Sequence, residues 1–180
     1  AQAQSQLDAA RARVQQASRP ADGDAIEREL ESLGTAPGAD LPAADLAVAF
    51  LANVLKNFGS VDCVANRSGV VKTLAEYLYR HFRSHRLVAG NDPNLAAMPW
   101  REAGVLPRFG TVEPGEPVAL SYALLGVAEI GAVVTVTGKA NPAANNLLSE
   151  HHIVVVDSTR LVRDMESAWE RIEAESAKTG

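Results

Sequence analysis

Residues 118–136, VALSYALLGVAEIGAVVTV, decide the fold class of this chain. This apolar run is long enough to suggest a membrane-spanning helix. However, it contains Gly126, Glu129 and Gly131, and a carboxylate inside a lipid bilayer is costly. Its β-branched residues instead predict two buried strands, over residues 118–125 and 132–137.

Further helices and strands are predicted on both sides of this run. Apolar residues recur at spacings of three and four in the helical segments. The expected helices cover residues 45–57, 70–82 and 95–103, with a turn over 66–69, and a last helix runs from Asp157 or Thr159 to about residue 176. The expected strands cover residues 61–65, 86–88 and 153–156. Because helices alternate with apolar strands, we predict an α/β fold with helices flanking a mostly parallel sheet.

The amino-terminal part has a different composition. Residues 1–17 are rich in Ala and Gln, and their weak apolar stripe predicts a helix. Residues 34–42 are rich in Gly, Pro, Ala and Asp, which is typical of a linker. We therefore expect an N-terminal helical arm and linker over 1–40 and the α/β domain over 41–180.

Charge and cysteine content exclude some functions. The net charge is −5 and the pI about 5.4, which argues against non-specific nucleic-acid binding, since that needs a basic face. Cys63 is the one cysteine, so the sequence can form no internal disulfide and cannot supply the four thiolates of an iron–sulfur cluster. No metal-ligand spacing and no secretory signal is recognisable, and we expect a cytoplasmic protein without a membrane span.

Two segments carry a family resemblance. The first is GVAEIG at residues 126–131, and the second is NNLLSEHHIVVV at residues 145–156. Together they resemble the lactate utilisation protein C family, whose LUD domain has Gly-Ile-Ala-Glu-Thr-Gly before a strand, then Asn-Phe-Leu-Pro, two residues, a His and an aliphatic strand. The motif positions in this sequence are Gly126, Glu129, Gly131, Asn146, Leu148 and His152.

The resemblance covers roughly residues 41–176 and implies a fold and a role. The family resembles the sugar-phosphate isomerase and CoA-transferase group, which has a Rossmann-like parallel sheet with ligands near the carboxyl ends of strands. Its bacterial members are linked to operons for L-lactate oxidation that also encode iron–sulfur subunits. The implied function is an accessory subunit or factor in oxidation of L-lactate to pyruvate, with clusters only in the partner proteins.

The sequence departs from the family pattern in three places. Ile130 stands where the family has Thr or Ser, which removes a hydroxyl that could bond a ligand. Ser149 replaces the family's Pro. Family members also continue beyond the position of Gly180 into a final strand, so we expect this sequence to stop short of the family's carboxyl end.

Five residues are candidates for a site. Glu129 lies between two glycines, where a partly desolvated carboxylate of raised pKa could serve as general base or acid. His152 begins an apolar strand and could move a proton or bind a carboxylate. Both residues also have a structural interpretation, as hydrogen-bonding partners of backbone groups. Gly126, Gly131 and Asn146 are the candidate ligand-binding residues.

Two other functions remain open at this stage. One is an independent enzyme that acts on a small carboxylated or acyl metabolite through Glu129. The other is a regulatory domain that binds an organic acid without converting it. Self-association into a homo-oligomer is also left open, as is the question of whether this chain is catalytic.

Overall fold

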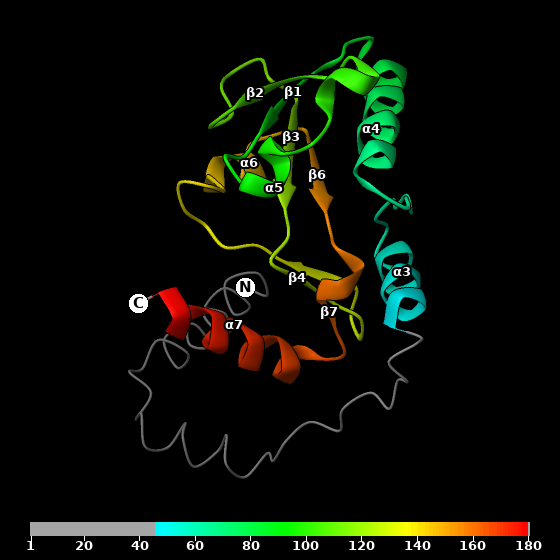
Figure 1. The fold of residues 1–180 in the computed structure, drawn as a ribbon. Coiled ribbons are helices and arrows are strands. Elements are labelled where there is room, and N and C mark those ends of the chain that lie inside the picture. Colours follow the sequence, from blue (N-terminus) through cyan, green and yellow to red (C-terminus); the bar gives the residue numbers. More distant parts are fainter. Residues whose placement is uncertain (1–45, 180) are drawn as a thin grey trace, which may run out of the picture. The chain divides into compact units, whose positions relative to one another are not determined.

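The structure is a computed structural model that describes residues 46–179, so the predicted arm and linker lie outside the described residues. Its main element is a four-stranded, fully parallel sheet in the order β2-β1-β3-β6 (Figure 1). The four strands are β1 (Arg86–Ala89), β2 (Leu106–Phe109), β3 (Val118–Tyr122) and β6 (His151–Val155). The predicted α/β class with a Rossmann-like parallel sheet is confirmed.

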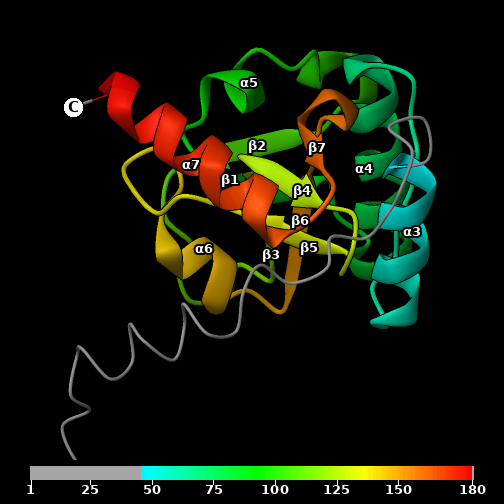
Figure 2. The ribbon, with the colours of Figure 1, turned by 90° about the horizontal axis from the view of Figure 1, so that it is seen from below.

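Helices lie on both faces of this sheet (Figure 2). Helix α4 (Arg67–Phe82) buries Val71, Leu74 and Leu78 against one face. The short helix α6 (Ala143–Leu147) contacts β3 and β6. Helix α4 begins at Arg67, so the turn predicted over residues 66–69 is wrong there. Its start is set by Asn66, whose side chain accepts a 2.9 Å hydrogen bond from the Gly69 amide, as an N-cap residue does.

A second, smaller sheet has three strands in the order β5-β4-β7. It consists of β4 (Leu125–Val127), β5 (Ala132–Val134) and β7 (Leu161–Val162), and β4 pairs antiparallel with β5. The predicted single strand over 118–125 is therefore wrong. The chain passes from one sheet to the other between two neighbouring residues. The Ala123 amide donates to the Val155 carbonyl of β6, and the Leu124 amide donates to the Val134 carbonyl of β5.

Three other predictions need correction. Residues 61–65 form no strand. The helix predicted over 95–103 is two short pieces, α5 (Pro93–Ala96) and the 3₁₀ turn η2 (Trp100–Ala103), because Pro99 between them cannot supply a helical amide. Strand β5 ends at Val134, before the predicted end at residue 137.

The last helix starts later than predicted. After the 3₁₀ turn η3 (Ser158–Arg160), the chain pairs with β4 as β7, which delays helix α7 (Met165–Thr179). Asp164 accepts a 2.8 Å hydrogen bond from the Ser167 amide and so caps α7. Strand β2 was missed by the pattern, since it contains Pro107 and lies at the sheet edge, where proline is tolerated. Within residues 46–179, no helix is both long and apolar enough to cross a membrane.

Helix α3 (Leu46–Lys56) lies against the turn between β4 and β5. The Asn53 side-chain amide donates to the carbonyls of Ala128 and Glu129, both at 2.9 Å, and Asn57 donates to Ile130 at 2.8 Å. In that turn Gly131 has φ +66°, and a Cβ placed on it would lie 2.5 Å from the Val54 backbone nitrogen. Only glycine allows this approach.

We expect Gly131→Ala to lower the free energy of unfolding by about 2–4 kcal/mol, because it adds both backbone strain and a clash with α3. Gly138→Ala is the matched control, since an added Cβ there meets no atom within 4 Å. Urea unfolding followed by circular dichroism measures both variants. Equal stability of the two would contradict this account of the turn.

Candidate functional site

The structure separates the five predicted site residues into two groups. Gly126, Glu129 and Gly131 lie in and around the β4–β5 hairpin of the small sheet. His152 and Asn146 lie at the parallel sheet, on β6 and α6. Glu129 and His152 are therefore on different sheets and do not form one acid–base pair.

The glycines of the first group serve the packing of α3 and the strands. A Cβ on Gly126 would lie 2.8 Å from Leu161, 3.0 Å from Phe50 and 3.2 Å from Val156. The backbone amide of Glu129 donates to the Arg163 carbonyl at 2.9 Å, and the Glu129 carbonyl accepts from the Asn53 side chain. The Glu129 carboxylate has no hydrogen bond or ion pair within the described part of the chain, which leaves its oxygens available.

The second group forms a hydrogen-bonded network between β3, β6 and α6. Ser121 Oγ, fully buried, donates to Asn146 Oδ1 at 2.9 Å. His152 Nε2 lies 3.0 Å from the same Ser121 oxygen. Asn146 Nδ2 donates to Thr135 Oγ1 at 3.2 Å. The network thus connects His152 to the loop that follows β5.

This network determines the protonation of His152. Because the Ser121 hydroxyl hydrogen goes to Asn146, its oxygen accepts from the ring, which places the His152 proton on Nε2. Burial lowers the pKa of His152 below its ordinary value. The ring is therefore neutral near pH 7, with the lone pair on Nδ1. A neutral imidazole can accept a proton, but it gives a carboxylate no cationic partner.

One buried polar atom near the carboxyl end of β1 has no partner among residues 46–179. Asn141 is 7% exposed, and its Oδ1 accepts no hydrogen bond from these residues, while its Nδ2 donates to the Val136 carbonyl at 3.3 Å. A Cβ on Gly90, the residue after β1, would lie 2.6 Å from the Ala140 carbonyl oxygen, so this loop covers the strand end. Buried acceptors are rarely left unpaired without a reason.

The same loop carries a cation. Lys139 is exposed, and its backbone carbonyl accepts from the Asn91 side chain at 3.3 Å. Ligands of open parallel sheets bind outside the carboxyl ends of the strands. Asn141 and Lys139 therefore lie where this fold class binds small molecules.

A cavity of about 440 Å³ lies at the opposite, amino ends of β3 and β6. Its lining includes Glu113, Glu116 and Glu150. The guanidinium of Arg108 hydrogen-bonds Glu116 at 2.6 Å and holds the pKa of that carboxyl below its usual range. This acidic cavity is unsuitable for an organic acid. Within residues 46–179, no three His, Cys, Asp or Glu side chains gather into a group that could hold a metal ion.

Comparison with known protein families finds a match for the segment that runs from β3 to α7. Residues 117–180 match the LUD domain. The resemblance to that family is thereby confirmed over this segment, which carries all the motif positions. No curated protein matches the sequence.

A solved structure supports the fold over a longer stretch than the LUD match. The chain is similar to a DUF162 family protein from Deinococcus radiodurans, with a TM-score of 0.58 and 16% sequence identity. The similarity covers 77% of this chain and 85% of the other. At this identity the likeness concerns the fold, and it extends the shared architecture beyond the LUD segment.

Several polar residues of these sites were not predicted from the sequence. Asn53 lies on the mostly apolar helix α3 and Asn57 follows the end of that helix, and their spacing of four was a readable signal of a shared polar target. Ser121 is a polar residue inside an apolar strand, which was a weaker signal. Thr135 and Asn141 acquire their significance only from the folded loop.

The depressed pKa of His152 predicts a pH dependence of stability. The unfolded chain takes up a proton near the ordinary pKa of about 6.5, whereas the buried ring resists protonation. This contribution to stability is full above 6.5 and decreases as the pH falls toward the folded-state pKa. Between roughly pH 7.5 and 5 we expect the free energy of unfolding to fall less in His152→Gln than in the wild type.

The exposed His85 is the control for this measurement. His85→Gln should leave the pH dependence near that of the wild type in urea unfolding at several pH values. If His152→Gln behaves like His85→Gln, the ring is not protected from protonation as described.

Proposed function

We propose that the chain acts in lactate utilisation, as an accessory subunit or factor in oxidation of L-lactate to pyruvate with iron–sulfur partner proteins. The observation that carries the proposal is the LUD match over residues 117–180. A single cysteine, Cys63, leaves cluster binding to the partners. The proposal also places the protein in the cytoplasm of a bacterium.

The partner assignment predicts a complex. Purification of the protein from its source organism grown on L-lactate should recover iron–sulfur proteins in stoichiometric amounts, measured by mass spectrometry and by iron and acid-labile sulfide content. Cells grown on pyruvate are the control for lactate dependence. Recovery of the protein alone from both cultures would contradict the stable complex.

An organic-acid-binding domain is a second candidate, favoured by the loop at the carboxyl end of β1. A 2-hydroxy acid has a carboxylate that Lys139 can attract. Its hydroxyl can donate to Asn141 Oδ1, which is buried, only when the loop around residues 138–141 moves aside. An acidic cavity and a neutral His152 offer no comparable partner for an anion.

This second candidate predicts that L-lactate binds more tightly than propionate, which lacks the 2-hydroxyl, by roughly tenfold. Asn141→Leu should remove that difference, because it removes the acceptor. Lys139→Gln should weaken both acids, whereas Lys56→Gln, an exposed lysine on α3, should weaken neither. Isothermal titration calorimetry measures all four proteins, and equal affinity for the two acids in the wild type would refute the site.

A further inference from the structure

The amino ends of the parallel strands form a face that carries charges of both signs. All four strands run in the same direction, in the order β2-β1-β3-β6, so their first residues lie along one edge of the sheet. We call this edge the amino face. Arg86 begins β1, whereas Glu116 comes shortly before β3 and Glu150 just before β6. Neighbouring strands are about 4.8 Å apart, so the two signs of charge lie close together.

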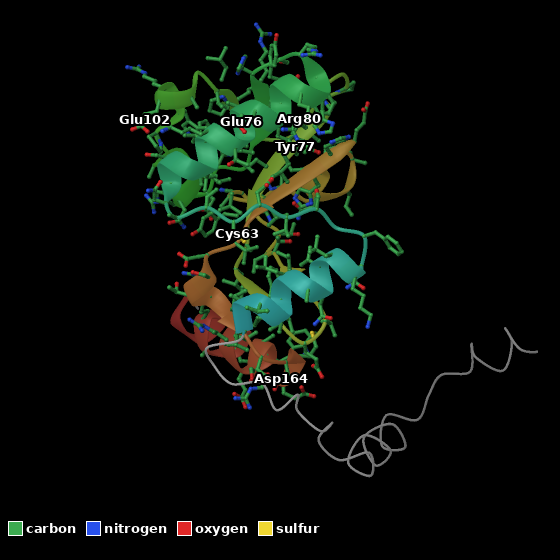
Figure 3. The ribbon with its side chains drawn as sticks, turned by 90° about the vertical axis from the view of Figure 1, so that its right-hand side faces the viewer. Cys63, Glu76, Tyr77, Arg80, Glu102 and Asp164 are labelled. Carbon is green, nitrogen blue, oxygen red and sulfur yellow. The ribbon has the colours of Figure 1, made fainter. Side chains whose placement is uncertain are left out.

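The basic half of the amino face is the end of α4 and the start of β1. Arg80, Arg83 and Arg86 are exposed there, and none of them forms an ion pair with a described residue. Figure 3 shows Arg80 on the last turns of α4. The Arg83 guanidinium lies 5.1 Å from the centre of the Tyr79 ring, which is 52% exposed. Cations this close in the chain repel one another, and an anionic partner would relieve that repulsion.

Helix stability alone does not explain these arginines. Cations in the last turn of a helix interact favourably with its dipole, which accounts for Arg80. Arg83, however, follows the helix in the left-handed region, with φ 50°, where glycine or asparagine is the less strained choice. Arg86 belongs to β1 and lies outside the helix. These two residues therefore indicate a use of positive charge beyond the stabilisation of α4.

The acidic half of the amino face is the cavity of about 440 Å³ at the starts of β3 and β6. Its carboxylates are those of Glu113, Glu116 and Glu150. Arg108 pairs with the first two and leaves Glu150 without an ion pair among residues 46–179. Phe82, next to Arg83 at the end of α4, also lines the cavity, so the two halves adjoin.

The lining of this cavity suits the side chain of an arginine. Besides its carboxylates it has apolar walls, which include Phe82, Pro117 and Leu148. Leu148 is 74% exposed, although it is a large apolar residue. An arginine has an aliphatic stem that packs on such walls and a guanidinium that pairs with carboxylates.

We propose that two copies of this chain associate through their amino faces about a two-fold axis. The basic half of each copy meets the acidic half of the other, and an arginine of each copy enters the other's cavity. A two-fold contact uses the same patch twice and therefore needs a patch that is complementary to itself. Adjoining halves of opposite charge meet this condition. A partner of one sign would instead be attracted by one half and repelled by the other.

Sedimentation equilibrium of the full chain measures this association. We expect a monomer–dimer equilibrium that weakens by at least roughly tenfold between about 20 mM and about 500 mM NaCl, because salt screens the paired charges. NMR spectra at increasing protein concentration locate the contact. The amide signals of residues 80–86, 112–117 and 148–150 should shift, while those of α7 should not. The inference is independent of the lactate role, because it rests on the charges of the amino face.

Charge reversal tests whether the two halves are complementary. The double variant Arg80→Glu/Arg86→Glu makes the basic half acidic, and Glu113→Lys/Glu150→Lys makes the acidic half basic. Each double variant should be monomeric by itself, because like charges then meet across the two-fold axis. An equimolar mixture of the two should form a heterodimer, since every half again faces the opposite charge.

Two reversals of charge outside the amino face are the controls. Lys56→Glu on α3 and Glu170→Lys on α7 change exposed residues and should associate as the wild type does. Circular dichroism checks that every variant is folded, and a double variant that does not fold is replaced by its Gln counterpart, which should weaken the dimer.

Three results would overturn the proposal. The first is a protein that stays monomeric at low salt up to the highest concentration that remains in solution. The second is a dimer that persists in both folded double variants. The third is a mixture of the folded double variants that stays monomeric, since it would show that the two halves do not recognise each other.

Discussion

The approach of α3 to the β4–β5 turn is the contact on which the small sheet depends. Gly131 leaves room for the backbone of α3, and Asn53 then satisfies two turn carbonyls that strand pairing leaves free. On the same helix, Phe50 packs over Gly126 beside Leu161 of β7. One helix therefore fixes both the turn and the strand pairing behind it.

Residues that make contacts local to the sequence were predictable, and residues whose partners are distant were not. The helix that ends at Phe82 was predicted because its apolar period is local, whereas residues 67–69 of the predicted turn are the capped first turn of that helix. The break between β3 and β4 was not, because Leu124 differs from Ala123 only in its distant partner. Residues 61–65 have strand composition but lack a pairing neighbour among the described residues, and propensity alone does not make a strand.

The same division explains what the sequence revealed of the candidate sites. The motif identified Gly126, Glu129 and Gly131, whose arrangement comes from a six-residue segment. It could not show that the glycines admit α3, since the helix lies more than seventy residues earlier in the sequence. Asn141 gave no signal either, because an Asn in a turn is ordinary until burial removes water from its carbonyl oxygen.

Charge distinguishes the hollows of the described residues from the loop at the carboxyl end of β1. A groove along β6 has Asp62 and a neutral His152, and the cavity at the amino ends of the strands is acidic, so both repel a carboxylate. The loop over the carboxyl end of β1 combines a cation with an unpaired buried acceptor. The Asn146–Ser121–His152 network joins Thr135, just after β5, to β6, so the position of that part of the loop and the position of the strand depend on the same hydrogen bonds.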